Sequence, residues 1–253
     1  MNAPTTTSRF ESFDGVRLAV HDVGEGRPTV LLHGYLASAE LNYVQPGIAA
    51  HLLAAGRRLI MPDLRGHGAS DAPTEEAAYP PDVLARDAEA ILARLDLGDY
   101  DLVGYSLGAR TAARLLARGA RPRRAVLAGM GDSGVTNPAD RAAQFEAWLT
   151  GDPAADPDAV QRVQGMLAER GLSLPAMLGV LKSFVATTPA ELAAVDLPVL
   201  VVSGARDEDN GSAEALAGLL PKARALRTPG NHLSAVAKPE LAAAILAFLD
   251  EGR

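Results

Sequence analysis

The 253-residue sequence contains no cysteine and has fewer basic than acidic residues. The absence of cysteine excludes disulfide bonds, thiolate metal sites and a cysteine nucleophile. The formal net charge is −7, from 24 Lys and Arg against 31 Asp and Glu residues, whereas nucleic acids and anionic membranes require a basic surface. We therefore expect no nucleic-acid partner, no membrane partner, and a small molecule as the ligand.

Long apolar segments are also missing from the sequence. No run is long enough to cross a bilayer, and the first residues, MNAPTTTSRF, lack a basic region followed by an apolar stretch. These features predict no signal peptide and a cytoplasmic location. No two histidines have the spacing of metal ligands, so we expect no metal and no cofactor. The composition leaves both a monomer and a homodimer open.

Short apolar runs alternate with amphipathic stretches along most of the chain. Residues such as TVLLHG, RLIMPD, DLVGYS, RAVLAG and PVLVVSG have the length and continuous hydrophobicity of strands buried on both faces. The stretch PDVLARDAEAILARLDL places apolar residues three to four apart, which predicts an amphipathic helix. Near the start, RFESF and VRLAVHDV flank Asp14-Gly15, a dipeptide that favours a tight hairpin turn. This order predicts a mainly parallel, doubly wound α/β sheet that follows an antiparallel pair.

The alternation of strands and helices stops between AVLAGMGDSG and PVLVVSG. The intervening residues contain helix-like pieces that are separated by prolines. We therefore predict a helical insertion at residues 135–197, and a core domain formed by residues 1–134 and 198–253.

The pentapeptide GYSLG, residues 104–108, lies where a predicted strand gives way to a helix. A serine on such a turn exposes its hydroxyl, and the residues two before and two after it must be small for strand and helix to approach. Gly104 and Gly108 meet this requirement. Ser106 is therefore a candidate nucleophile, and the Leu107 N–H, at the positive end of the helix, is a candidate oxyanion donor.

A serine hydroxyl becomes a strong nucleophile only when a base accepts its proton. His232 lies just after ARALRT, which we interpret as the last strand, and Asp207 lies just after the strand PVLVVSG. Both therefore belong to the sheet edge where Ser106 lies, and Asp207 is the carboxylate predicted to orient the histidine. Asp132, which also follows a predicted strand, and Asp209 remain alternatives for this role.

Five segments, LLHGYLAS, MPDLRGHGASD, GYSLGA, SGARDED and PGNHLSAV, resemble the α/β-hydrolase family in their order and separation. The resemblance implies an eight-stranded, mostly parallel sheet flanked by helices, with a small helical cap inserted after the sixth strand. It also implies a Ser106, Asp207 and His232 triad and a second oxyanion donor at the N–H of Tyr35. Related dehalogenases and epoxide hydrolases carry aspartate where this chain has serine, which favours ester chemistry.

The expected function is that of a serine hydrolase that cleaves a small carboxylic ester through an acyl-enzyme. Enol-lactone hydrolysis and cofactor-free perhydrolysis are alternatives, as is a non-catalytic ligand-binding protein with the same fold. His67, with Asp63 and Arg65, is expected to brace a turn near the site. The candidate residues for the substrate pocket are His33, Tyr105, Met130, Trp148, Met177, Leu181, Phe184 and Leu233.

Overall fold

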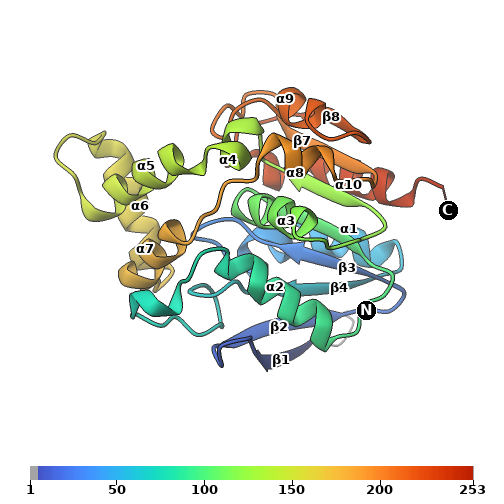
Figure 1. The fold of residues 1–253 in the computed structure, drawn as a ribbon, viewed down its shortest axis with the longest axis horizontal. Helices are drawn as coiled ribbons and strands as arrows, with labels where there is room; N and C mark the ends of the chain where they lie inside the picture. The colour runs from blue at the N-terminus through green and yellow to red at the C-terminus, as the bar shows by residue number, and fades with distance from the viewer. Residues whose placement is uncertain (1–4, 253) are drawn as a thin grey trace.

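The computed structural model describes residues 5–252, which form one eight-stranded sheet with helices on both faces (Figure 1). The strand order is β1-β2-β4-β3-β5-β6-β7-β8. The strands are β1 (Thr5–Glu11), β2 (Arg17–Val23), β3 (Arg27–Leu32), β4 (Arg57–Pro62), β5 (Asp101–Tyr105), β6 (Ala125–Ala128), β7 (Val199–Gly204) and β8 (Ala223–Thr228).

Strand direction follows the pattern that the sequence predicts. β2 pairs antiparallel with both β1 and β4, and the remaining pairs, β4 with β3, β3 with β5, β5 with β6, β6 with β7 and β7 with β8, are parallel. Gly15, with φ at +85°, lies in the turn between β1 and β2, where a left-handed backbone is needed. The eight-stranded, mostly parallel fold class is therefore confirmed.

Two apolar layers hold the helices against the sheet. Helices α1 (Ile48–Ala54) and α10 (Pro239–Asp250) pack on one face, and α2 (Val83–Arg94), α3 (Leu107–Ala117) and α9 (Ala213–Gly218) pack on the other. Successive residues of a strand point to opposite faces, so Leu102 belongs to one layer and Val103 to the other. Burial on both faces explains why the central strands are apolar throughout. Three short helical turns complete the core: η1 (Glu40–Val44), η2 (Glu76–Ala78) and η3 (Ala235–Ala237).

The segment between β6 and β7 is helical. It contains α4 (Asp132–Thr136), α5 (Pro138–Thr150), α6 (Pro157–Glu169), α7 (Leu174–Lys182) and α8 (Pro189–Ala193). A proline occupies the first or second position of α5, α6, α7 and α8, where its missing N–H leaves no helical bond unmade. Helices α5, α6 and α7 lie together at one side of the molecule in Figure 1. That residues 135–197 act as a cap stays a prediction.

Within residues 5–252, no helix combines the length and the apolar character needed to cross a membrane.

Candidate active site

Ser106 occupies the sharp turn between β5 and α3. Its backbone has φ 54° and ψ −113°, a conformation that is unfavourable for a residue with a side chain. The Ser106 N–H donates to the carbonyl of Ala128 on β6 over 2.8 Å, and the Ser106 carbonyl accepts from the N–H of Arg110 over 3.0 Å. The neighbouring strand and the first helical turn therefore hold the serine in this strained geometry.

The two glycines that flank Ser106 allow this turn to pack. A Cβ atom on Gly104 would lie 2.2 Å from the carbonyl oxygen of Gly108, and a Cβ on Gly108 would lie 1.8 Å from the carbonyl oxygen of Leu32. Backbone atoms cannot move aside as a flexible side chain can. Helix α3 can therefore approach β3 and β5 this closely only with glycine at both positions.

The structure brings Ser106, His232 and Asp207 into one hydrogen-bond chain. The Oγ atom of Ser106 lies 3.0 Å from Nε2 of His232, and Nδ1 of His232 lies 3.0 Å from Oδ2 of Asp207. The Asp207 side chain is 3% exposed and the His232 side chain 13%. With the Nδ1 proton donated to the buried carboxylate, Nε2 is free to accept the serine proton.

The alternative carboxylates make other contacts. Asp132 accepts the backbone N–H of Ser212 at Oδ1 over 2.8 Å, and Asp209 forms an ion pair with Arg141 over 2.8 Å. Of the three candidates, Asp207 is the one that bonds the His232 ring.

Hydrogen bonds between side chains and the backbone fix the loop that carries His232. The Tyr105 hydroxyl donates to the His232 carbonyl over 2.5 Å, and the Asn231 side chain accepts the Ser234 N–H over 3.0 Å. The residue before Ser106 therefore anchors the histidine loop directly, which fixes the distance between serine and imidazole.

Two unpaired backbone N–H groups lie beside Ser106. Within residues 5–252, the N–H groups of Tyr35 and Leu107 have no hydrogen-bond acceptor, whereas those on either side of Tyr35 are bonded. Gly34 donates to Oδ1 of Asn42 over 2.9 Å, and Leu36 donates to Nε2 of His67 over 3.2 Å. A Cβ atom on Gly34 would lie 3.5 Å from Cβ of Ser106. The loop after β3 therefore presents its free N–H close to the serine.

Two buried, neutral histidines support this loop. His67 Nδ1 donates to the carbonyl of Arg65 over 3.0 Å, and His33 Nδ1 donates to the carbonyl of Gly34 over 2.8 Å. The unprotonated Nε2 of His33 accepts a hydrogen bond from the Leu64 N–H over 2.9 Å. Burial lowers the pKa of His33, and burial together with His33 lowers the pKa of His67 to about 3. Both rings therefore brace the loops after β3 and β4 as neutral acceptors.

Two neighbouring cavities share Ser106 as a lining residue. The outer cleft, which Ser106, His232 and the predicted residues Tyr105, Trp148 and Leu233 line, has a volume of about 410 Å³. The inner cavity, between α3 and the helices α5 and α7, has about 20 Å³ and is lined by Ser106 and the predicted Leu181 and Phe184. Tyr35, Ser106, Phe145 and Arg141 line both.

Three residues predicted for the pocket line neither cavity. His33 is fully buried in the brace described above. The terminal methyl of Met177 lies 3.0 Å from where a Cβ on Gly66 would be, and the Met130 sulfur lies 2.5 Å from where a Cβ on Gly134 would be. Both methionines therefore pack next to a glycine and not into a cavity. The apolar character of a residue does not show which of its neighbours it will face.

Several residues that line the two cavities were absent from the predicted pocket, among them Arg110, Arg141 and Phe145. Arg110 follows Ser106 by four residues, about one turn of a helix, so this signal was available. Arg141 and Phe145 come from α5, and only the packing of α5 over the core reveals their position.

Comparison with known proteins places the chain in a family. Residues 28–164, more than half of the chain, match the family model described as alpha/beta hydrolase fold. The chain belongs to this family, as the sequence motifs predicted.

Similar proteins include hydrolases of several kinds. The chain is 38% identical over 146 residues to 2-hydroxymuconate semialdehyde hydrolase from Pseudomonas sp. (strain CF600), which covers 54% of this chain and 49% of that protein. The esterase EaEST from Exiguobacterium antarcticum is structurally similar with a TM-score of 0.80 at 19% identity, over 97% of this chain and 100% of that one. Esterase RhEst1 from Rhodococcus sp. ECU1013 has a TM-score of 0.71 at 26% identity, over 97% and 98%. The chain spans less than half the length of the first curated relatives it matches.

Proposed function

We propose that the chain is a serine hydrolase that cleaves small carboxylic esters through an acyl-enzyme. The observation that carries this proposal is the hydrogen-bond chain from Ser106 through His232 to Asp207, next to the free N–H groups of Tyr35 and Leu107. A nucleophile, a base, an acid that orients the base, and an anion site are the four parts that acyl transfer requires.

In the first half of the reaction, Ser106 Oγ attacks the ester carbonyl while Nε2 of His232 takes the serine proton. Asp207 stabilises the imidazolium that forms. The N–H groups of Tyr35 and Leu107 bind the oxyanion of the tetrahedral intermediate, a contribution of roughly 10² to 10³ in rate for each donor. The intermediate then breaks the bond to the alcohol oxygen, and His232 protonates the departing alcohol.

In the second half, a water molecule attacks the acyl-enzyme. His232 accepts a proton from this water, and the same two N–H groups bind the second oxyanion. When the bond between the acyl carbon and Ser106 Oγ breaks, His232 returns its proton to the serine. The acid is released and the enzyme is restored.

The insertion at residues 135–197 is proposed to act as a cap over this site. The Tyr35 hydroxyl donates to the carbonyl of Met177 on α7 over 2.9 Å, and the Arg170 side chain donates to the carbonyl of Leu36 over 2.5 Å. These contacts link the insertion directly to the loop that carries one oxyanion donor. The cap also supplies Phe145 and Trp148, whose rings pack edge to face with centroids 5.0 Å apart, to the wall of the outer cleft.

A fluorophosphonate probe, with intact-protein mass spectrometry, tests this function. The wild type is expected to gain one probe mass, Ser106→Ala none, and the matched control Ser133→Ala one. A panel of short acyl esters, thioesters and lactones assigns the preferred bond. Labelling and turnover that persist in Ser106→Ala would contradict the serine mechanism, and the absence of both in the wild type would favour a ligand-binding protein.

A further inference from the structure

A buried arginine in the wall of the inner cavity has no acidic partner. Arg110, on α3, is 6% exposed. Its Nε donates to the carbonyl of Gly134 over 2.7 Å, and its guanidinium carbon lies 4.2 Å from the centroid of the Phe184 ring. Among residues 5–252, no carboxylate forms an ion pair with Arg110, and no acceptor bonds its two terminal nitrogens. Among the described residues, four of its five N–H donors therefore have no acceptor.

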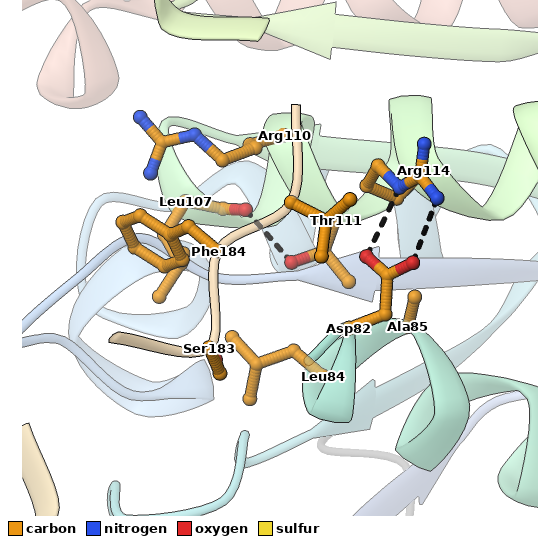
Figure 2. A pocket seen from close by; sticks show the side chains of 10 residues that line it. Asp82, Leu84, Ala85, Leu107, Arg110, Thr111, Arg114, Ser183 and Phe184 are labelled. Carbon is orange, nitrogen blue, oxygen red and sulfur yellow. Dashed lines mark hydrogen bonds and ion pairs between the residues drawn. The ribbon is translucent and has the colours of Figure 1, made fainter. Parts of the chain in front are cut away.

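The other buried arginines of the core do have acidic partners. Arg57 pairs with Asp101, Arg65 with Asp87, and Arg114 with Asp82, each over 2.7 Å. In Figure 2 the Arg110 guanidinium extends away from the Asp82 and Arg114 pair and lies over the Phe184 ring. A buried charge is costly unless it is paired. Arg110 is therefore the position in this region where a partner from outside the chain would fit.

The inner cavity is positively charged. Two arginines, Arg110 and Arg141, line it, and no aspartate or glutamate does. Arg141 is already bonded to Asp209 over 2.8 Å, which leaves Arg110 as the uncompensated charge. Burial, and to a smaller extent Arg141, lowers the pKa of Arg110 to about 10, so the guanidinium remains charged at neutral pH.

Arg110 is well placed to reach a group attached to the reacting carbonyl. It follows Ser106 by four residues on α3, about one helical turn or roughly 5.4 Å along the axis. Side chains of a helix tilt toward its N-terminus, so the guanidinium points back toward the level of the serine. Both side chains line the inner cavity, as do the two proposed oxyanion donors.

We propose that Arg110 binds a carboxylate on the acyl group of the substrate, and that the substrates are half-esters of short dicarboxylic acids. This assignment rests on the proposed function. The acyl side is favoured because the proposed oxyanion donor Leu107 lines the inner cavity and not the outer cleft, whereas His232, which protonates the alcohol, lines the outer cleft and not the inner cavity. A guanidinium binds a carboxylate through paired, charge-assisted hydrogen bonds.

The size of the inner cavity limits the acyl group to a short chain. Its volume of about 20 Å³ is close to the size of one small polar group, and a terminal carboxylate would occupy this space beside Arg110. A longer diacid would have to displace Leu181 and Phe184, which line the same cavity.

The test compares monomethyl succinate with methyl 4-methylpentanoate, in which an isopropyl group replaces the carboxylate. Proton release at constant pH gives kcat/KM for each ester, and their ratio is the measured quantity. Charge-assisted hydrogen bonds contribute about 1.5 to 3 kcal/mol, so Arg110→Met is expected to lower the ratio about 100-fold. Arg110→Lys should retain a ratio well above that of Arg110→Met. The matched control Arg118→Met, at the C-cap of the same helix, should retain the wild-type ratio. Among the monomethyl half-esters from malonate to adipate, adipate is expected to be the poorest substrate.

Two results would overturn the carboxylate site while leaving the proposed function intact. One is a wild type that hydrolyses esters but prefers the neutral one. The other is an Arg110→Met variant that slows both esters equally, as loss of the bond to the Gly134 carbonyl alone would do. If the wild type hydrolyses no ester, calorimetry with succinate decides separately: binding that Arg110→Met abolishes supports the anion site, and absence of binding to the wild type refutes it.

Discussion

Replacement of Asp207 by asparagine tests the proposed triad at its most sensitive point. The carboxylate accepts from Nδ1 of His232 over 3.0 Å, and its side chain is 3% exposed, so water cannot take over its role. An asparagine amide that donates to Nδ1 would leave the imidazole proton on Nε2. That proton would then point at Ser106 Oγ, 3.0 Å away, and His232 would no longer be able to act as base.

The expected loss is about 10⁴ in kcat, as the same exchange produces in a serine protease, equivalent to about 5.4 kcal/mol at 1.36 kcal/mol per tenfold change. Asp132→Asn is the matched control. Asp132 accepts the Ser212 N–H over 2.8 Å, and an amide oxygen can accept the same bond. We therefore expect Asp132→Asn to lose less than tenfold.

The assay is the initial rate of hydrolysis of a short acyl ester, together with thermal unfolding of each variant. Comparable unfolding temperatures are needed, because a loss of folded protein would imitate a loss of catalysis. A nearly normal Asp207→Asn enzyme beside an inactive Asp132→Asn enzyme of equal stability would refute the assignment.

Three further perturbations test the oxyanion loop, the pH dependence of stability and the cavity walls. Tyr35→Phe is expected to retain kcat within tenfold, whereas Tyr35→Pro, which removes the N–H, should lose roughly 10² to 10³; equal rates, with a crystal structure showing an intact loop, would argue against this donor. Burial raises the pKa of Asp63, but hydrogen bonds from His21 and from two backbone N–H groups outweigh it and lower this pKa to about 2. The ionised carboxylate therefore stabilises the fold above pH 4, and this stabilisation is lost as the pH falls toward 2. Urea unfolding should therefore show that Asp63→Asn has a free energy of unfolding lower than wild type by about 2 kcal/mol at pH 6 and about 1 kcal/mol at pH 3. The exposed control Asp196→Asn should show no such pH trend. A difference between Asp63→Asn and wild type that does not shrink with pH would contradict the lowered pKa of Asp63. Trp148→Ala and Leu181→Ala should shift the preferred ester size, since each methylene contributes about 1 to 3 kcal/mol to discrimination, and an unchanged substrate profile in folded variants would mean that these walls do not select.

Short sequence patterns made the sheet, and the positions of Ser106, Asp207 and His232 at its edge, predictable. Ser106, Asp207 and His232 each follow an apolar run with the length of a buried strand, and parallel strands end at a common edge. Three distant residues could therefore be assigned to one place without any knowledge of their contacts. The two glycines around Ser106 added a steric requirement that backbone geometry alone imposes.

The supporting contacts were not predictable in the same way. Asn42, which accepts the Gly34 N–H, lies in the short helix η1 and has no local pattern that indicates a role. Met177 carries the same apolar character as Leu181, yet it packs over Gly66 while Leu181 lines the inner cavity. Such differences depend on how a helix is rotated against a partner that is remote in sequence.

Under the proposed function, substrate choice depends on the junction between the core and the insertion. The reacting groups belong to loops of the core sheet, but the inner cavity also requires Phe145 from α5 and Leu181 from α7. Arg110 connects the two parts, because its guanidinium bonds the carbonyl of Gly134, the last core residue before the insertion, and stacks on Phe184 within the insertion. A change in the seating of α5 or α7 would therefore alter the space around the charged group without displacing Ser106, His232 or the backbone donors. Selectivity can consequently change in this fold while the acyl-transfer geometry is retained.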